Sequence, residues 1–221
     1  MHDELGTRMK KYEAVYDHKL TPNSCVFIRV DGKAFHTFTE DCDKPFDYEL
    51  IDTMVKSAWQ TSKEMQGFKL AYTQSDEATF MLTDFDRHET QGWFNYELNK
   101  LVSITASLFT AHFNDLYPHN NSLALFDARA FVVPLDDAPN VFIWRQKDWE
   151  RNAIQMMAQS IFSHGELQGK SNRKVKEMLE FAGNKFDQQP QSARFGTFID
   201  RNETAICKSL DYYQIAELIK V

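Results

Sequence analysis

The stretch that decides the fold is Cys25-Val-Phe-Ile-Arg-Val-Asp-Gly-Lys33, an apolar run that ends in a carboxylate followed by glycine. Its apolar residues fall on both faces of an extended chain, which predicts a central strand. The strand ends at Asp31, and Gly32 allows the backbone to turn sharply and bring its carbonyl close to a ligand. A second acidic pair, Asp76-Glu77, interrupts the apolar run 70–82, which predicts a hairpin with these acids at its turn.

If these strands are neighbours, Asp31 and Asp76 point at one spot. Two like charges about 4 Å apart repel by roughly 4 kcal/mol at an effective dielectric constant of about 20, so a cation is expected between them. Two divalent ions held by carboxylate and backbone oxygens fit, and such pairs serve phosphoryl and nucleotidyl transfer. The residues leave open whether Asp76 or Glu77 is the closer ligand. Taken alone, Asp31 is equally compatible with an ordinary turn.

Composition limits the class of protein. With 221 residues, 43% hydrophobic and 26% charged, the chain can bury one core, which excludes disordered and collagen-like classes. No run of about 18 apolar residues occurs, so no membrane span is expected. The polar, acidic N-terminus is unlike a signal or transit peptide, which predicts a cytoplasmic location. Three separated cysteines favour neither disulfides nor structural zinc. The net charge of −7 argues against a protein that coats nucleic acid, but not against local basic surfaces.

The predicted elements follow the order β-α-β-β-α-β, the split arrangement of a ferredoxin-like antiparallel sheet with helices on one face, which is the palm of many polymerases and cyclases. We therefore expect an α+β fold: a palm-like catalytic domain with an N-terminal helix over 1–137, and a helical C-terminal part over 138–221 packed on it as one compact unit. The expected elements are helix 4–17, strand 25–31, helix 47–65, strands 68–74 and 77–83, helix 93–117, strand 129–134, helices 139–163 and 171–182, strand 194–199 and helix 211–219.

Several residues near the first strand suit a nucleoside triphosphate. The segment Lys33-Ala34-Phe35-His36 offers backbone N–H groups, a cation and a ring over the turn. Lys44 and Lys100 are further candidates for phosphate contacts, although lone lysines are usually only solvated. The run Trp144-Arg145-Gln146-Lys-Asp148 mixes stacking, cationic and amide groups that suit nucleic acid, and a structural helix start explains it almost as well.

Candidate RNA-binding residues are basic or polar side chains of the C-terminal third, for which the alternative is a solvated helix face. They are Arg145, Gln146, Arg151, Asn152, Lys174 and Arg194.

Five separated motifs, spread over roughly residues 5–200, resemble in order those of the tRNA(His) guanylyltransferase superfamily. They are Val30–Phe38, Lys44-Pro45, Tyr72–Glu77, Phe126–Arg129 and Trp144–Asp148. Members of that family add nucleotides in the 3'-to-5' direction to the 5' end of tRNA, so the resemblance implies a palm-like nucleotidyltransferase and a homotetramer.

The resemblance also implies a set of site residues. Two magnesium ions would be held by Asp31, the Gly32 carbonyl and Asp76, and nucleotide contacts would run along residues 31–36 and at Ser75 and Asp76. We expect Asp31, Asp76 and Glu77 to form the catalytic set, with ATP, GTP and other nucleoside triphosphates as substrates.

One departure concerns the choice of RNA. Eukaryotic guanylyltransferases carry His-Ile-Asn-Asn where this chain has Glu150-Arg-Asn-Ala153, so that only Asn152 matches. The loss resembles the Thg-like-protein branch, which repairs truncated tRNA 5' ends by template-dependent addition. A monophosphorylated tRNA would first be adenylylated with ATP, after which the 3'-hydroxyl of an incoming nucleotide displaces AMP.

Two alternatives from other functional classes stay open. A nucleotidyl cyclase uses the same palm and metals, although this chain lacks a Gly-Gly-Asp-Glu-Phe turn. A non-catalytic RNA-binding module would need no metal chemistry at all.

Overall fold

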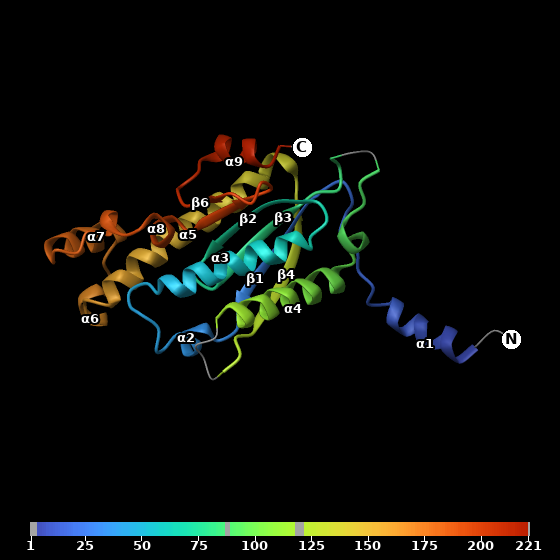
Figure 1. Ribbon diagram of the computed structural model, residues 1–221, viewed down its shortest axis with the longest axis horizontal. Coiled ribbons are helices and arrows are strands. Elements are labelled where there is room, and N and C mark those ends of the chain that lie inside the picture. Colours follow the sequence, from blue (N-terminus) through green and yellow to red (C-terminus); the bar gives the residue numbers. More distant parts are fainter. Residues whose placement is uncertain (1–3, 87–88, 118–121, 221) are drawn as a thin grey trace.

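The computed structural model describes residues 4–86, 89–117 and 122–220 (Figure 1). Its described part contains a six-stranded sheet in the order β4-β1-β3-β2-β5-β6, in which every neighbouring pair is antiparallel. The strands are β1 (Cys25–Gly32), β2 (Phe68–Gln74), β3 (Glu77–Leu82), β4 (Phe126–Val133), β5 (Thr197–Asp200) and β6 (Ala205–Ile206). The helices are α1 (Glu4–Ala14), α2 (Phe35–Phe38), α3 (Tyr48–Lys63), α4 (Leu98–Leu116), α5 (Ala138–Gln159), α6 (His164–Leu167), α7 (Asn172–Phe181), α8 (Gln191–Phe195) and α9 (Tyr212–Leu218).

The order β1-α3-β2-β3-α4-β4 confirms the predicted ferredoxin-like unit, with its four strands arranged 4-1-3-2. The C-terminal segment extends this sheet, because β5 pairs with β2 and β6 pairs with β5. The helix α3 begins as predicted, since the Asp47 carboxylate accepts a hydrogen bond from the backbone N–H of Leu50 and caps the helix.

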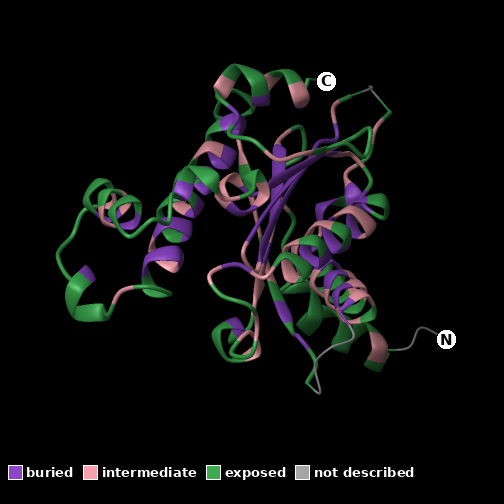
Figure 2. Cartoon of the chain, turned by 60° about the vertical axis from the view of Figure 1, so that its left-hand side comes forward, coloured by how far each residue is buried: buried purple, intermediate pink, exposed green. Residues whose placement is uncertain are grey.

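Both faces of the sheet are covered, which explains why β1 is apolar on both sides. Val26, Ile28 and Val30 pack under α3 and α4, whereas Cys25 and Phe27 alternate with them and pack under α5 and α9. Figure 2 shows the resulting buried sheet between its helices. The palm helices therefore lie on one face, as predicted, and the C-terminal helices cover the other.

A third apolar cluster holds the C-terminal part together. The second half of α5 contributes Trp149, Ile154 and Met157, which pack with Val175 and Leu179 of α7. In contrast, α1 stands away from the body at one end of the molecule and buries none of its residues (Figure 1). No helix in the described ranges is both long and apolar enough to cross a membrane.

The structure corrects the bounds of several predicted elements. β4 begins at Phe126 and not at residue 129, and α5 ends at Gln159 and not at residue 163. The helix expected from Trp93 begins at Leu98, because Phe94, Asn95 and Tyr96 have left-handed backbone angles (φ 49°, 51° and 56°). The Tyr96 carbonyl instead accepts a hydrogen bond from the backbone N–H of Leu20 at 2.9 Å, which ties this turn to the segment after α1.

The strand expected over 194–199 begins only at Thr197. Residues Gln191–Phe195 form α8, and Gly196 (φ 67°) separates the helix from the strand. A Cβ atom at Gly196 would overlap the Thr73 carbonyl and the Tyr72 ring, so this close approach requires glycine.

Candidate active site

Asp31 and Asp76 come together at one end of the central strands. Asp31 is the penultimate residue of β1 and lies opposite Glu77 of β3 on one side and Asp127 of β4 on the other. Ser75 and Asp76 form the turn between β2 and β3, and the Gly32 N–H donates a 3.0 Å hydrogen bond to the Asp76 carbonyl. This hydrogen bond holds the end of β1 against the turn between β2 and β3.

The electrostatics of this pair favour a cation. Burial raises the pKa of the Asp76 carboxyl, the neighbouring charge of Asp31 raises it further, and hydrogen bonding that includes the Ser75 side chain lowers it. Within the described ranges no lysine or arginine forms an ion pair with Asp31 or Asp76; the nearby Arg29 and Arg145 pair with Glu77.

The oxygen atoms at this site suit magnesium better than a metal that takes all of its ligands from the protein. Mg²⁺ is usually held by one or two carboxylates and completes its octahedron with water and substrate phosphates. Two carboxylates and the Gly32 carbonyl fit that pattern. No group of three or more His, Cys, Asp or Glu side chains with metal-site geometry occurs among the described residues.

Glu77 differs from Asp76, although the two are adjacent in sequence. Arg145 Nε donates to Glu77 Oε1 at 2.7 Å and its Nη2 donates to Oε2 at 3.0 Å, while Arg29 Nε lies 3.6 Å from Oε2. Burial raises the pKa of Glu77, and the charges of Arg145 and Arg29 oppose that shift. Because Glu77 already has cationic partners, Asp76 is the better candidate for a metal ligand.

Two hollows flank the carboxylates. One, of about 450 Å³, is formed mainly by the loop between β1 and α3 and includes Gly32, His36, Lys44 and Asp76 in its lining. The other, of about 420 Å³, lies against α5 and includes Asp31, Asp76 and Glu77. Both are large enough for a small ligand. Ser75, Asp76 and Met156 line both hollows, so the turn between β2 and β3 lies between them.

The turn after Asp31 places its residues in different surroundings. Lys33, Ala34 and His36 are exposed, and Ala34 adopts a left-handed conformation (φ 53°). Phe35 is buried and packs against Phe38, Phe113 and Phe126, so its ring belongs to the core. A Cβ atom on Gly32 would overlap the Phe35 ring, which explains the glycine at this position.

The two candidate lysines lie in different places. Lys44 lines the first hollow, where its Nζ donates to the Thr39 carbonyl at 2.7 Å, and its peptide bond to Pro45 is cis. Lys100 pairs with Glu97 at 2.8 Å near the start of α4. The site lies near the other end of this helix, roughly 24 Å away at 1.5 Å per residue. The structure therefore does not bring Lys100 to the site.

Three of the residues predicted to contact RNA have structural partners instead. Arg145 is 6% exposed and pairs with Glu77 and Asp148. Gln146 is 8% exposed and bonds through both ends of its amide to the backbone of Leu210, at 2.9 and 2.8 Å.

Arg194 forms the third such case, because it donates to the Asp187 carboxylate at 2.8 Å and lies over the rings of Phe186 and Phe195. The other three, Arg151, Asn152 and Lys174, are exposed and therefore accessible to an RNA.

The sequence reasoning missed some residues that line the hollows. Gln155, Met156 and Gln159 of α5 face the second hollow. Since they follow Asn152 at helical spacing, the period of the helix could have identified them. Arg29 was also missed, although a charge inside an apolar strand signals a buried partner.

Comparisons with known proteins identify the family of this chain. A family model described as tRNAHis guanylyltransferase matches residues 6–134. The tRNA(His) guanylyltransferase of Schizosaccharomyces pombe is 33% identical over 158 residues, which cover 66% of this chain and 56% of that protein. The chain thus spans little more than half the length of that curated relative.

Two solved structures are similar over nearly the whole chain. A bacterial tRNA(His) guanylyltransferase-like protein in complex with ATP superposes with a TM-score of 0.94 at 34% identity, over 99% of this chain and 100% of that one. Such a protein in complex with GTP gives a TM-score of 0.88 at 32% identity, with the same coverage. The match of the family model to more than half of the chain, together with the shared fold, shows that the chain belongs to the tRNA(His) guanylyltransferase family, a family of nucleotidyltransferases.

Proposed function

We propose that this protein adds nucleotides in the 3'-to-5' direction to the 5' end of tRNA, with the opposite strand as template, and so repairs truncated 5' ends. The observation that carries the proposal is the carboxylate pair Asp31 and Asp76, which has no described cationic partner and lies between two hollows. Two hollows on either side of one reacting centre suit a reaction that joins a nucleotide to an RNA end.

In this proposal Asp31, Asp76 and the Gly32 carbonyl hold two magnesium ions. When bound, the ions would lower the pKa of the attacking hydroxyl and neutralise developing charge on the phosphates. The side chains of His36 and Lys44 line the first hollow and are placed to bind a triphosphate, and Ser75 orients Asp76. Glu77 positions the strand end through its ion pair with Arg145 and does not itself bind metal.

The substrates are a tRNA, ATP for activation, and GTP or another nucleoside triphosphate for addition. The bacterial relatives bound to ATP and GTP support this choice. First, a 5'-phosphate oxygen of the RNA attacks the α-phosphorus of ATP, and pyrophosphate leaves. Next, the 3'-hydroxyl of the incoming nucleotide attacks the 5'-phosphate of the RNA and displaces AMP, while its own triphosphate becomes the new 5' end.

The exposed residues Arg151, Asn152 and Lys174 are proposed to contact the RNA. Residues 150–153 differ from the eukaryotic His-Ile-Asn-Asn segment, which favours repair of several tRNAs over a strict choice of tRNA(His). The cytoplasmic location expected from the sequence remains a prediction.

The direct test is Asp76→Ala, assayed with magnesium, ATP, GTP and a tRNA that lacks its 5'-terminal nucleotide. We expect incorporation of labelled GTP to fall by at least 100-fold, because the change removes a proposed ligand of the magnesium ions at the reaction centre. Glu217→Ala is the matched control, since Glu217 is an exposed carboxylate on α9 that pairs with Lys220, and it should retain full activity.

Three results would count against the proposal. Retained incorporation by Asp76→Ala would overturn the metal assignment. A cyclic product from GTP without RNA would favour the cyclase. Tight RNA binding by the wild-type protein, unaffected by a chelator and without any incorporation, would favour a non-catalytic binding module.

A further inference from the structure

The motif Trp144–Asp148 separates into buried and exposed members. Arg145 and Gln146 are buried, as described above, whereas Trp144 is 51% exposed on the outer side of α5. Trp93 and Trp149 are buried in apolar clusters, but Trp144 belongs to none of the three clusters among the described residues. Its exposure therefore needs an explanation other than core packing.

Charged groups hold the Trp144 ring in place. The Arg145 guanidinium lies 4.5 Å from the ring centroid and the Arg29 guanidinium lies 5.5 Å from it, both within the range of cation–π attraction. Glu77 pairs with both guanidinium groups. The indole is thus fixed by the network that also supports the end of β1, and half of its surface remains open to solvent.

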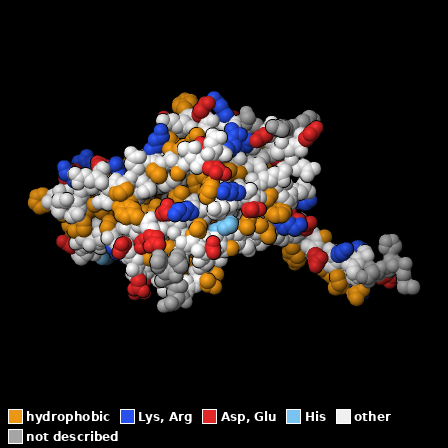
Figure 3. All heavy atoms as spheres, viewed as in Figure 1, with side chains coloured by type: hydrophobic (Ala, Val, Ile, Leu, Met, Phe, Trp, Pro, Cys, Tyr) orange, Lys and Arg blue, Asp and Glu red, His pale blue; other side chains and the backbone are white. Residues whose placement is uncertain are grey.

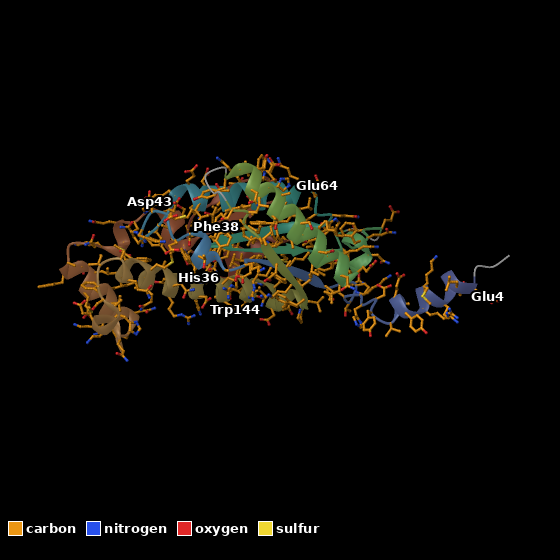
Figure 4. All side chains as sticks on the ribbon, turned by 90° about the horizontal axis from the view of Figure 1, so that it is seen from below. Glu4, His36, Phe38, Asp43, Glu64 and Trp144 are labelled. Atoms are coloured by element: carbon orange, nitrogen blue, oxygen red, sulfur yellow. The ribbon has the colours of Figure 1, made fainter. Side chains whose placement is uncertain are left out.

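The Trp144 ring contacts Arg29, which precedes Asp31 by two residues on β1. Arg29 and Asp31 project from the same face of β1 and are two residues apart, or roughly 7 Å. Figure 4 shows Trp144 of α5 and His36 of α2 on the same lower side of the molecule.

The strand beside Trp144 is uncovered. Arg129 and Asp127 of β4 lie opposite Arg29 and Asp31, and their side chains are 54% and 63% exposed. Because α5 leaves this part of β4 open, an RNA strand can approach Asp31 along it. Arg129 forms an exposed ion pair with Asp127 at 3.5 Å and can also offer its cation to a phosphate there, and Trp144 offers a flat ring to a base.

We propose that Trp144 stacks on a nucleobase of the RNA substrate near its 5' end, and so positions that end at Asp31 and Asp76. The inference rests on the proposed function and names its RNA subsite. We assign the ring to RNA and not to the incoming nucleotide, because Trp144 lines neither hollow, whereas His36 and Lys44 line the first one.

The test compares Trp144→Leu, which keeps an apolar side chain without an aromatic face, with Trp144→Phe, which keeps the face. Binding of a labelled, 5'-truncated tRNA is measured by fluorescence anisotropy at fixed salt and without nucleotide. We expect Trp144→Leu to raise Kd roughly 5- to 100-fold, which is the effect of losing one stacked base. Trp144→Phe should stay close to wild type. Tyr213→Leu, which removes an exposed aromatic ring from α9, is the matched control and should bind as wild type.

Kinetic measurements distinguish a stacking role from a structural one. Trp144→Leu should raise KM for the tRNA and leave KM for GTP unchanged, with a melting temperature close to that of the wild type. Unchanged RNA affinity in Trp144→Leu, or a loss equal in both variants, would overturn the inference. A rise confined to KM for GTP would also overturn it, because the ring would then bind the free nucleotide.

A second measurement does not require the variants to be active. The intrinsic fluorescence that is present in the wild type and absent from Trp144→Phe should be quenched when the tRNA binds. Quenching without nucleotide incorporation would support the stacking and reject the proposed function. Incorporation without quenching would support the proposed function and reject the stacking.

Discussion

At the scale of single residues, Asp76 and Glu77 show how neighbouring carboxylates acquire different roles. Glu77 begins β3 and points under α5, where Arg145 and Arg29 neutralise it. Asp76 lies one residue earlier in the turn, beside Asp31 and at the border of both hollows. A buried ion pair suits a supporting role, whereas a carboxylate that repels its neighbour suits a ligand of a cation.

This difference predicts opposite effects on stability. Glu77→Ala should lower the free energy of unfolding by about 3–5 kcal/mol, because it leaves the buried Arg145 short of its main partner. Asp76→Asn is the matched substitution next to it, and should leave the melting temperature equal or higher, because it removes the repulsion with Asp31. Thermal unfolding in the presence of a chelator measures both. Equal destabilisation by the two changes would contradict the assignment of separate roles.

At the scale of elements, the β2–β3 hairpin is anchored at the end far from the turn by a buried lysine. Lys69 of β2 has no exposed side-chain surface and pairs with Asp86, which also accepts a 2.7 Å hydrogen bond from the Thr83 hydroxyl. Burial acts to raise the pKa of Asp86, but hydrogen bonds from Lys69 and Thr83 and the charge of Lys69 together outweigh it and lower the pKa.

We expect Asp86→Asn to destabilise the protein by about 3 kcal/mol, because the buried ammonium group of Lys69 is left without its charged partner. The pKa of Asp86 is lowered in the folded state, so the stability it contributes is present above the ordinary carboxyl pKa of about 3.9 and is lost as the pH falls through the folded value. Denaturant unfolding between neutral pH and pH 3 should therefore show a smaller loss of stability on acidification in Asp86→Asn than in the wild type.

Asp52→Asn is the control for that measurement. Asp52 forms an exposed ion pair with Lys56 one turn along α3, a type of pair that contributes only about 0.3–0.5 kcal/mol. If Asp52→Asn and Asp86→Asn cost the same, the Lys69 pair does not anchor the hairpin.

At the scale of the whole molecule, the apolar side chains of α1 are exposed. Helix α1 projects from the body, and apolar side chains are visible along it in Figure 3. Its exposed apolar residues, with the two that follow it, are Leu5, Met9, Tyr12, Val15 and Tyr16. Large exposed apolar patches usually mark interaction sites, so this surface is available for the contacts that the predicted homotetramer would need.

The tetramer predicts a solution mass of four times 25.8 kDa by light scattering. If α1 contributes to assembly, Tyr12→Asp should lower that mass, because a charge then enters an apolar contact. Tyr213→Asp, an exposed tyrosine on α9, should leave it unchanged. A wild-type mass of a single chain would contradict the prediction.

The sequence by itself determined what depends on local patterns. Apolar residues on both faces of the segment 25–31 predicted a central strand. The interruption at residues 75–77, which contains the acidic pair Asp76-Glu77, predicted the hairpin turn. Asp47 predicted the start of α3. These features are set by residues close in the chain, whose side-chain period and turn chemistry can be read directly. The order of the elements then predicted the ferredoxin-like sheet.

Only the tertiary structure decided which side chains meet across the chain. Glu77 and Arg145 are 68 residues apart, and their contact follows from the packing of α5 on the face of β1 and β3. The same packing buries Gln146 and leaves Trp144 exposed. The placement of α4 separates Lys100, near its start, from the site near its other end. Sequence patterns give the period of a helix but not the rotation and position at which it packs on the sheet, and that placement selects the side chains of the site.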